Sequence, residues 1–288
     1  MNPLNPRIPL GEWADDFITW FQSAFSWLLD FVSIVLQGMY TGLFAVLSGP
    51  LFIVMLFVFA ALAWLAVGLR RGWKLALFTF IGFYIIRALD QWDNAMSTLA
   101  LVLVAVVIAL VIALPLGVWA AKSRAVSRIV RPILDFMQSM PALAYLVPAI
   151  VIFSVGQVPG AIATIIFALP PGVRFTELAI RQVDGEVVEA AQAFGASPSH
   201  ILFRVQLPLA LQTIMAGINQ VIMLALSMVV LAGMAGAEGL GGAVIESIGS
   251  LDVGLGIEAG LAVVILAIFL DRVTAALGSK GPGARAGR

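Results

Sequence analysis

The sequence predicts an all-α membrane protein with about seven membrane-spanning helices. Hydrophobic residues make up 61% of the 288 residues and charged residues only 11%, whereas a soluble domain carries about 25% charged residues. Apolar runs close to the roughly 20 residues that a helix needs to cross a bilayer recur along the chain. Polar residues gather in the short segments between these runs, so membrane helices are favoured over a soluble fold.

Residues 1–50 are predicted to form an extracytoplasmic tail that contains an amphipathic interfacial helix on the outer surface. Polar side chains within residues 15–41 fall in one narrow arc of a helical projection, and the opposite face is rich in tryptophan and phenylalanine. Such side chains suit the headgroup boundary of a membrane, and a bend is expected at Gly38 or Gly42. Alternatively, residues 31–47 form an eighth span, which would place the N-terminus in the cytoplasm.

Seven apolar runs follow this tail. Two accessory helices are expected within residues 51–90, and five further spans within residues 91–276. The predicted spans cover residues 51–69, 73–89, 96–121, 133–153, 158–180, 209–234 and 257–270. Residues 277–288 are rich in glycine and basic residues, so they are predicted to form a disordered tail.

Lysine and arginine residues gather at one end of the alternating spans, and the segments at the other end are mostly acidic. Because cytoplasmic loops carry an excess of basic residues, this asymmetry places the C-terminus in the cytoplasm and the N-terminus outside. The basic residues between the third and fourth spans are Lys122, Arg124, Arg128 and Arg131. The first residues lack a basic segment followed by a short apolar core, so no cleavable signal peptide is expected.

A polar segment, residues 182–208, separates two of the apolar runs and is predicted to be a helix–turn–helix. Asp184 and Gly185 are expected to start the first helix, and Gly195 fits the left-handed position after it, which a β-carbon would strain. Ser197 is a favourable N-cap for the second helix, which Leu207-Pro208 is expected to close. The apolar stripe of the first helix comprises Val187, Val188, Ala190, Ala191 and Phe194.

The spacing within this segment is the most specific signal in the sequence. Glu189-Ala190-Ala191 is followed after three residues by Gly195, and then after nine residues by Val205, one residue and Leu207-Pro208. This spacing resembles the cytoplasmic signature of permease subunits in bacterial ATP-binding-cassette importers, with valine in place of the usual isoleucine. The resemblance implies that residues 182–208 form a coupling loop that enters a cleft on a separate ATPase. It assigns ATPase-coupling roles to Glu189, Ala190, Ala191, Gly195, Ser197, Leu207 and Pro208.

Further stretches narrow the resemblance to the glycine betaine/proline betaine permeases. They cover residues 131–142, 167–174, 214–220 and 251–256. The resemblance implies a five-helix type I importer core with two extra N-terminal spans, in the bacterial inner membrane. It also implies a second copy of the chain, two ATPase subunits and an extracytoplasmic substrate-binding protein as partners. Choline, carnitine and histidine permeases share much of the pattern and remain alternatives.

The composition argues against other classes of protein. The chain has no cysteine, a single histidine (His200) and a net charge of zero. No metal site, enzymatic nucleophile or nucleic-acid partner is therefore expected. A secondary transporter or channel would carry ion-coupling carboxylates in mid-membrane, and no acidic residue lies well inside a predicted span. The chain lacks a phosphate-binding Gly-x-x-x-x-Gly-Lys-Ser/Thr loop, so ATP and magnesium are expected only in the ATPase.

Polar side chains inside the predicted spans are candidates for a translocation path. The candidates are Gln138, Ser139, Tyr145, Asn219 and Gln220. A quaternary ammonium group is attracted to aromatic faces, and Phe136 and Tyr145 are the aromatic residues nearest to Gln138. Hydrogen bonding between helices and simple packing are the alternative roles. Asp135 is expected to pair with Arg131, one helical turn away.

Overall fold

The structure is a computed structural model that describes residues 9–68 and 72–278, and within these ranges it contains helices and no strand. The all-α prediction is therefore confirmed. In chain order the helices are α1 (Leu10–Ala24), α2 (Ser26–Ser48), α3 (Phe52–Val67), α4 (Trp73–Ala88), α5 (Trp92–Lys122), α6 (Arg124–Ser139), α7 (Leu143–Phe153), α8 (Gln157–Arg181), α9 (Gly185–Ala193), α10 (Pro198–His200), the π-helix η1 (Ile201–Gln206), α11 (Leu207–Ala232), the 3₁₀-helix η2 (Gly233–Ala235), α12 (Leu240–Ser250) and α13 (Val253–Gly278).

The described helices support five or six membrane spans by length and composition. The five are α2, α5, α8, the continuous run Pro198–Ala235 and α13, and the bent pair α6–α7 would make a sixth. The accessory helices α3 and α4 have only 16 residues each. The predicted total of seven spans therefore stays a prediction.

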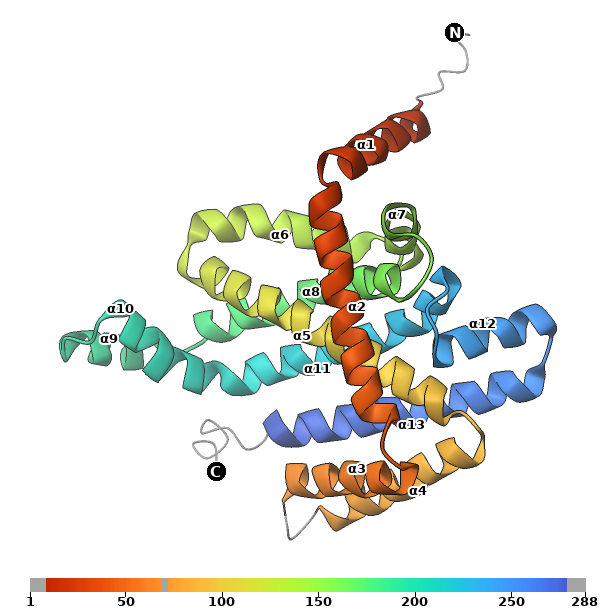
Figure 1. The fold of residues 1–288 in the computed structure, drawn as a ribbon. Helices are drawn as coiled ribbons and strands as arrows, with labels where there is room; N and C mark the ends of the chain where they lie inside the picture. Colours follow the sequence, from red (N-terminus) through yellow and green to blue (C-terminus); the bar gives the residue numbers. More distant parts are fainter. Residues whose placement is uncertain (1–8, 69–71, 279–288) are drawn as a thin grey trace.

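The centre of the bundle is formed by α5, α8 and α11, which run side by side (Figure 1). Glycines let these helices approach closely: a Cβ at Gly117 of α5 would lie 2.6 Å from the Cβ of Thr176 on α8. Likewise, a Cβ at Gly217 of α11 would lie 2.5 Å from the Cβ of Phe175. Small residues at such crossings are typical of membrane helix packing, where close van der Waals contact replaces the hydrophobic effect.

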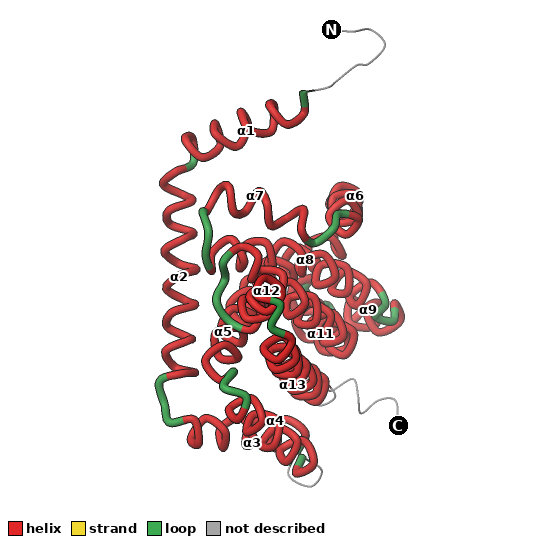
Figure 2. Tube along the Cα trace, turned by 90° about the vertical axis from the view of Figure 1, so that its right-hand side faces the viewer, coloured by secondary structure: helices red, strands yellow, loops and turns green. Residues whose placement is uncertain are grey.

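The helix α2 crosses the bundle instead of running along it, as the two perpendicular views show (Figures 1 and 2). It buries Leu36, Tyr40 and Leu47. The Tyr40 hydroxyl lies 2.8 Å from the Ser97 hydroxyl of α5 and accepts a 3.1 Å hydrogen bond from the Gln157 amide of α8. Although α2 has the length and composition of the alternative eighth span, its course differs from that of the other candidate spans.

The predicted bend at Gly38 or Gly42 is wrong. Both glycines lie inside the unbroken helix α2, and the chain bends instead at Phe25, between α1 and α2. The Phe25 ring lies 5.1 Å from the ring of Phe21 and edge-on to Trp20 at 6.1 Å. Phe25 has φ −118° and ψ 20°, outside the helical region, whereas a lone glycine in a helix carries only a modest penalty.

The predicted fourth span, residues 133–153, is not a single helix. Its two parts, α6 and α7, meet at an angle of 97°. Pro141 lies in the break, and a proline has no N–H to donate and pushes the preceding residue out of the helical region. Met140 accordingly has an extended backbone, with φ −77° and ψ 136°. Pro148, by contrast, lies inside α7 without ending it.

The C-terminal helix α13 extends to Gly278. Residues 277 and 278 are therefore helical, which corrects the start of the predicted disordered tail. The remainder of that predicted tail, residues 279–288, lies outside the described residues.

Candidate functional site

Residues 182–208, the predicted coupling loop, protrude from one end of the bundle, where Figure 1 shows α9 and α10. Its first helix begins as predicted, because the Asp184 carboxylate accepts a 3.0 Å hydrogen bond from the Glu186 N–H. Gly195 has φ +78°, the left-handed conformation expected after this helix. The N–H of Ala196 reaches back to the carbonyl of Ala191 at 3.1 Å, so the helix ends in a Schellman-type cap.

The second helix of the loop starts as predicted but does not end as predicted. The Ser197 hydroxyl accepts a 3.3 Å hydrogen bond from the His200 N–H. Leu207-Pro208 was expected to close this helix, yet α10, η1 and α11 form one continuous helical run. The π-turn explains the difference: the Leu207 N–H bonds to the Leu202 carbonyl, five residues back. This wider turn lets the helix continue past a proline that has no N–H to donate.

The residues of the loop signature are mostly accessible. Glu189, Ala190, Gly195 and Ser197 are exposed, and Ala191, Leu207 and Pro208 are half-buried. The side chain of Phe194 is 93% exposed, although the sequence assigned it to the apolar stripe of the first helix. Phe194 lies beyond the last helical residue and next to Gly195, so it leaves that stripe. Exposed aromatic residues of this kind are enriched at protein–protein interfaces.

A buried carboxylate lies at the base of the coupling loop. Glu177 of α8 is 3% exposed and receives three donors: the Ser127 hydroxyl at 2.7 Å, Arg131 Nη2 at 3.0 Å and Arg181 Nε at 2.9 Å. Arg181 also donates to the backbone carbonyl of Ala120 at 2.9 Å. The Glu177 carboxylate therefore joins α6 to α8 beneath the loop, and Arg181 extends the network to the end of α5.

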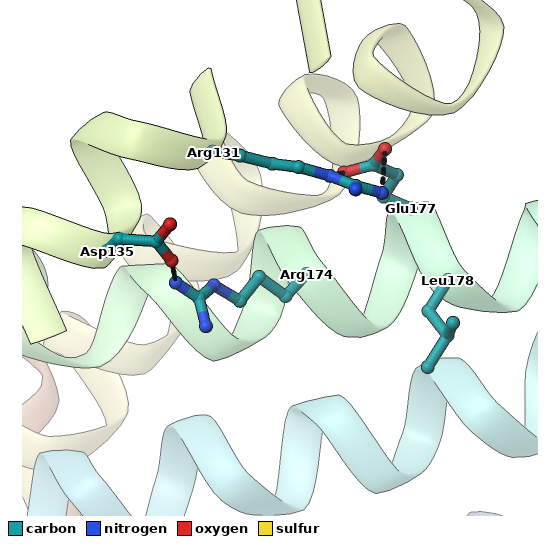
Figure 3. A pocket seen from close by; sticks show the side chains of 5 residues that line it. All are labelled: Arg131, Asp135, Arg174, Glu177 and Leu178. Carbon is teal, nitrogen blue, oxygen red and sulfur yellow. Dashed lines mark hydrogen bonds and ion pairs between the residues drawn. The ribbon is translucent and has the colours of Figure 1, made fainter. Parts of the chain in front are cut away.

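A second ion pair, between Asp135 of α6 and Arg174 of α8, lies beside the first (Figure 3). The expected pairing of Asp135 with Arg131 is therefore wrong, because both residues pair with α8 instead. The two pairs line a hollow of about 370 Å³. Glu177 was not among the predicted site residues, although a carboxylate three residues after Arg174 and four before Arg181 is a detectable helical charge pattern.

Three candidate path residues lie at the end of α6 and on α7. Gln138 and Ser139 are exposed at the end of α6, and the Ser139 hydroxyl donates to the Phe136 carbonyl at 2.8 Å. Tyr145 of α7 is buried, and its hydroxyl donates to the Met137 carbonyl. Because its ring also packs edge-on against Phe167 at 6.1 Å, Tyr145 holds the α6–α7 bend.

The other candidate path residues lie on α11. Gln220 is exposed, and the Asn219 side-chain oxygen is buried without a hydrogen-bond partner. Across the part of the chain that the structure describes, no hydrogen bond links Asn219 or Gln220 to Gln138, Ser139 or Tyr145. Residues 9–68 and 72–278 also contain no group of three histidine, cysteine or acidic residues that could hold a metal ion.

Comparison with known proteins identifies the family. Residues 113–280 match the family described as binding-protein-dependent transport system inner membrane component. The chain belongs to this family. The matched range includes residues 182–208 and also Glu177 with its partners Ser127, Arg131 and Arg181.

Curated relatives of this inner membrane component match over almost its whole length. The glycine betaine transport system permease protein OpuAB of Bacillus subtilis is 49% identical over 93% of this chain and 94% of its own length. The glycine betaine/carnitine transport permease protein GbuB of Listeria monocytogenes is 48% identical over 96% and 98%. The glycine betaine/proline betaine transport system permease protein ProW of Escherichia coli is 47% identical over 94% and 75%.

A solved structure with the same core is the inward-facing MetNI methionine ABC transporter. One of its chains aligns with a TM-score of 0.59 and 25% identity, over 65% of this chain and 95% of the transporter chain. The similarity therefore covers nearly all of the transporter chain and leaves about a third of this chain unmatched.

Proposed function

We propose that this protein is the permease subunit of an ATP-driven uptake system for glycine betaine and proline betaine. The observation that carries the proposal is the 47–49% identity, over more than nine-tenths of the chain, to three permeases whose names all include glycine betaine. One of the three names also includes proline betaine, and another includes carnitine. Family membership favours this function over a secondary transporter or channel. The protruding coupling loop, with its exposed Glu189 and Phe194, supports docking to a separate ATPase.

The proposed assembly contains two copies of this chain, two ATPase subunits and an extracytoplasmic substrate-binding protein. The coupling loop of each copy enters a cleft on one ATPase, which holds ATP and magnesium. ATP binding brings the ATPases together and moves the loops, so that the pore changes from inward-facing to outward-facing. Solute delivered by the binding protein then enters, and hydrolysis resets the cycle.

We place the coupling loop and the C-terminus in the cytoplasm and the N-terminus outside. The arginines of α6 near the loop support this orientation, because basic residues are enriched on the cytoplasmic side. Tyr40 of α2 bonds to Ser97 and Gln157, which lie at the ends of α5 and α8 far from the loop. The course of α2 across the bundle therefore supports an interfacial position at the outer surface for residues 1–50.

The proposed organisation divides the rest of the chain by role. Residues 51–90 are accessory helices and residues 91–276 form the permease core. The proposed path residues are Gln138, Ser139, Tyr145, Asn219 and Gln220. The buried, unpartnered oxygen of Asn219 supports a polar role within α11, because an unsatisfied polar atom in a membrane protein is costly.

Uptake by the purified system tests the function. The permease, its ATPase and its binding protein are reconstituted in proteoliposomes, and ATP-dependent uptake of labelled glycine betaine is measured. Proline betaine should compete fully, and carnitine, choline and histidine less well. The Glu189→Arg variant should reach the membrane at normal levels but lose uptake, because the loop no longer docks. Stronger competition by histidine or choline than by proline betaine would contradict the proposed solute.

A further inference from the structure

A buried charge network lies where the coupling loop meets the membrane helices. Glu177 is seven residues before Asp184, which caps the first helix of the loop. Its carboxylate is 3% exposed and is paired with Arg131 and Arg181. Removing one partner of a buried ion pair is strongly unfavourable because the other charge stays buried, so the helices that carry these three side chains are held together.

The network connects helices that are distant in sequence. Arg131 and Ser127 belong to α6. Arg181 of α8 also donates a hydrogen bond to the Ala120 carbonyl near the end of α5. Hydrogen bonds to charged groups are short and about twice as strong as neutral ones. A displacement of the loop end of α8 is therefore transferred to α6 and α5 rather than absorbed by sliding between the helices.

The second pair extends the connection along α6. Asp135 lies one turn beyond Arg131, and Arg174 lies one turn before Glu177, so the two antiparallel helices are joined at two levels (Figure 3). The same polar face of α6 continues to Gln138, which lies directly before the break between α6 and α7. The extended Met140 and Pro141 form that break, and the Tyr145 hydroxyl of α7 bonds across it to the Met137 carbonyl of α6.

We infer that Glu177 is a positioning residue that passes movement of the coupling loop to α6 and to the bend at Pro141. The inference rests on the proposed function, in which an ATPase moves the loop. Hydrogen-bond and salt-bridge networks between rigid helices can carry energetic coupling between distant sites. Here the connection runs from the loop through Glu177 and Arg131 along α6 to Gln138, which is itself a candidate path residue.

The test measures coupling rather than activity alone. Full-length Glu177→Gln permease is reconstituted with its ATPase and binding protein, and glycine betaine uptake and ATP hydrolysis are measured together. The number of solute molecules taken up per ATP should fall at least tenfold. The matched control is Glu246→Gln, an exposed carboxylate on α12 at the other end of the bundle, which should keep the wild-type ratio.

A charge exchange at the second level provides an independent measurement. Asp135→Arg places two arginines together and should lower the ratio, and adding Arg174→Asp should restore it because the pair re-forms with reversed charges. This exchange decides the matter alone if Glu177→Gln fails to accumulate in the membrane. A purely structural role would reduce uptake and hydrolysis in proportion and leave the ratio unchanged.

The outcomes separate the two proposals. A wild-type ratio in Glu177→Gln, or a double variant no better than Asp135→Arg alone, overturns the role of Glu177 and leaves the proposed function intact. If the wild-type system shows no glycine betaine uptake, the proposed function fails and this inference fails with it. A lowered ratio in Glu177→Gln, together with restoration by the exchange, supports the inference.

Discussion

Replacing Phe194 with alanine should weaken binding of the ATPase more than any other single truncation in the coupling loop. The ring is 93% exposed, so nearly all of its surface is available for burial against a partner. An aromatic side chain buries about 150–250 Å², which at about 25 cal/mol per Å² gives an upper limit of about 4–6 kcal/mol. Truncating a central aromatic anchor to alanine weakens the binding free energy by about 2–4 kcal/mol. A loss of about 2 kcal/mol corresponds to a roughly 30-fold higher Kd.

The measurement is the affinity of full-length permease, in lipid nanodiscs, for its purified ATPase. Phe31→Ala is the matched control, because Phe31 is also exposed, at 60%, but lies on α2 away from the loop. This control should keep the wild-type Kd. A Kd for Phe194→Ala within twofold of wild type would refute the assignment of Phe194 as an anchor.

The loop and the topology allow further tests. Gly195→Leu forces a β-carbon into a left-handed conformation at φ +78°, which costs about 1–2 kcal/mol; solute-stimulated hydrolysis should disappear, and normal stimulation would exclude a coupling role. Ser197→Ala should lose about 1 kcal/mol of helix capping, seen as faster amide exchange at His200, whereas Ser197→Asp should keep the wild-type rate. Asn2→Cys should react with an impermeant thiol reagent from outside the cell; labelling only after lysis would reverse the proposed orientation.

The features that local chemistry determines were predictable from the sequence. Asp184, Gly195 and Ser197 each act within a few residues of their own position, as caps or as a left-handed turn. Hydropathy likewise predicted the apolar helices, because the length needed to cross a membrane is a property of each segment alone. These signals are present in the chain before any tertiary contact forms.

The features that depend on distant contacts were not predictable in this way. Arg131 and Glu177 are 46 residues apart, and the sequence offered Asp135 as a closer partner for Arg131. The course of α2 is fixed by Tyr40, whose partners Ser97 and Gln157 are 57 and 117 residues away. The prediction that Leu207-Pro208 ends the second helix of the loop was wrong for another reason. The π-turn that accommodates Pro208 lies before it and has no sequence signature.

The continuous run from Pro198 to Ala235 has a geometric consequence. Its 38 residues correspond to a rod about 57 Å long at 1.5 Å per residue. One end lies in the coupling loop, and at the other end a Cβ on Gly233 would lie 2.3 Å from the backbone of Gly241. A tilt of about 10° around the midpoint displaces each end by about 5 Å in opposite directions. A single rotation of this helical run would therefore move its two ends, which lie at opposite ends of the bundle, in opposite directions.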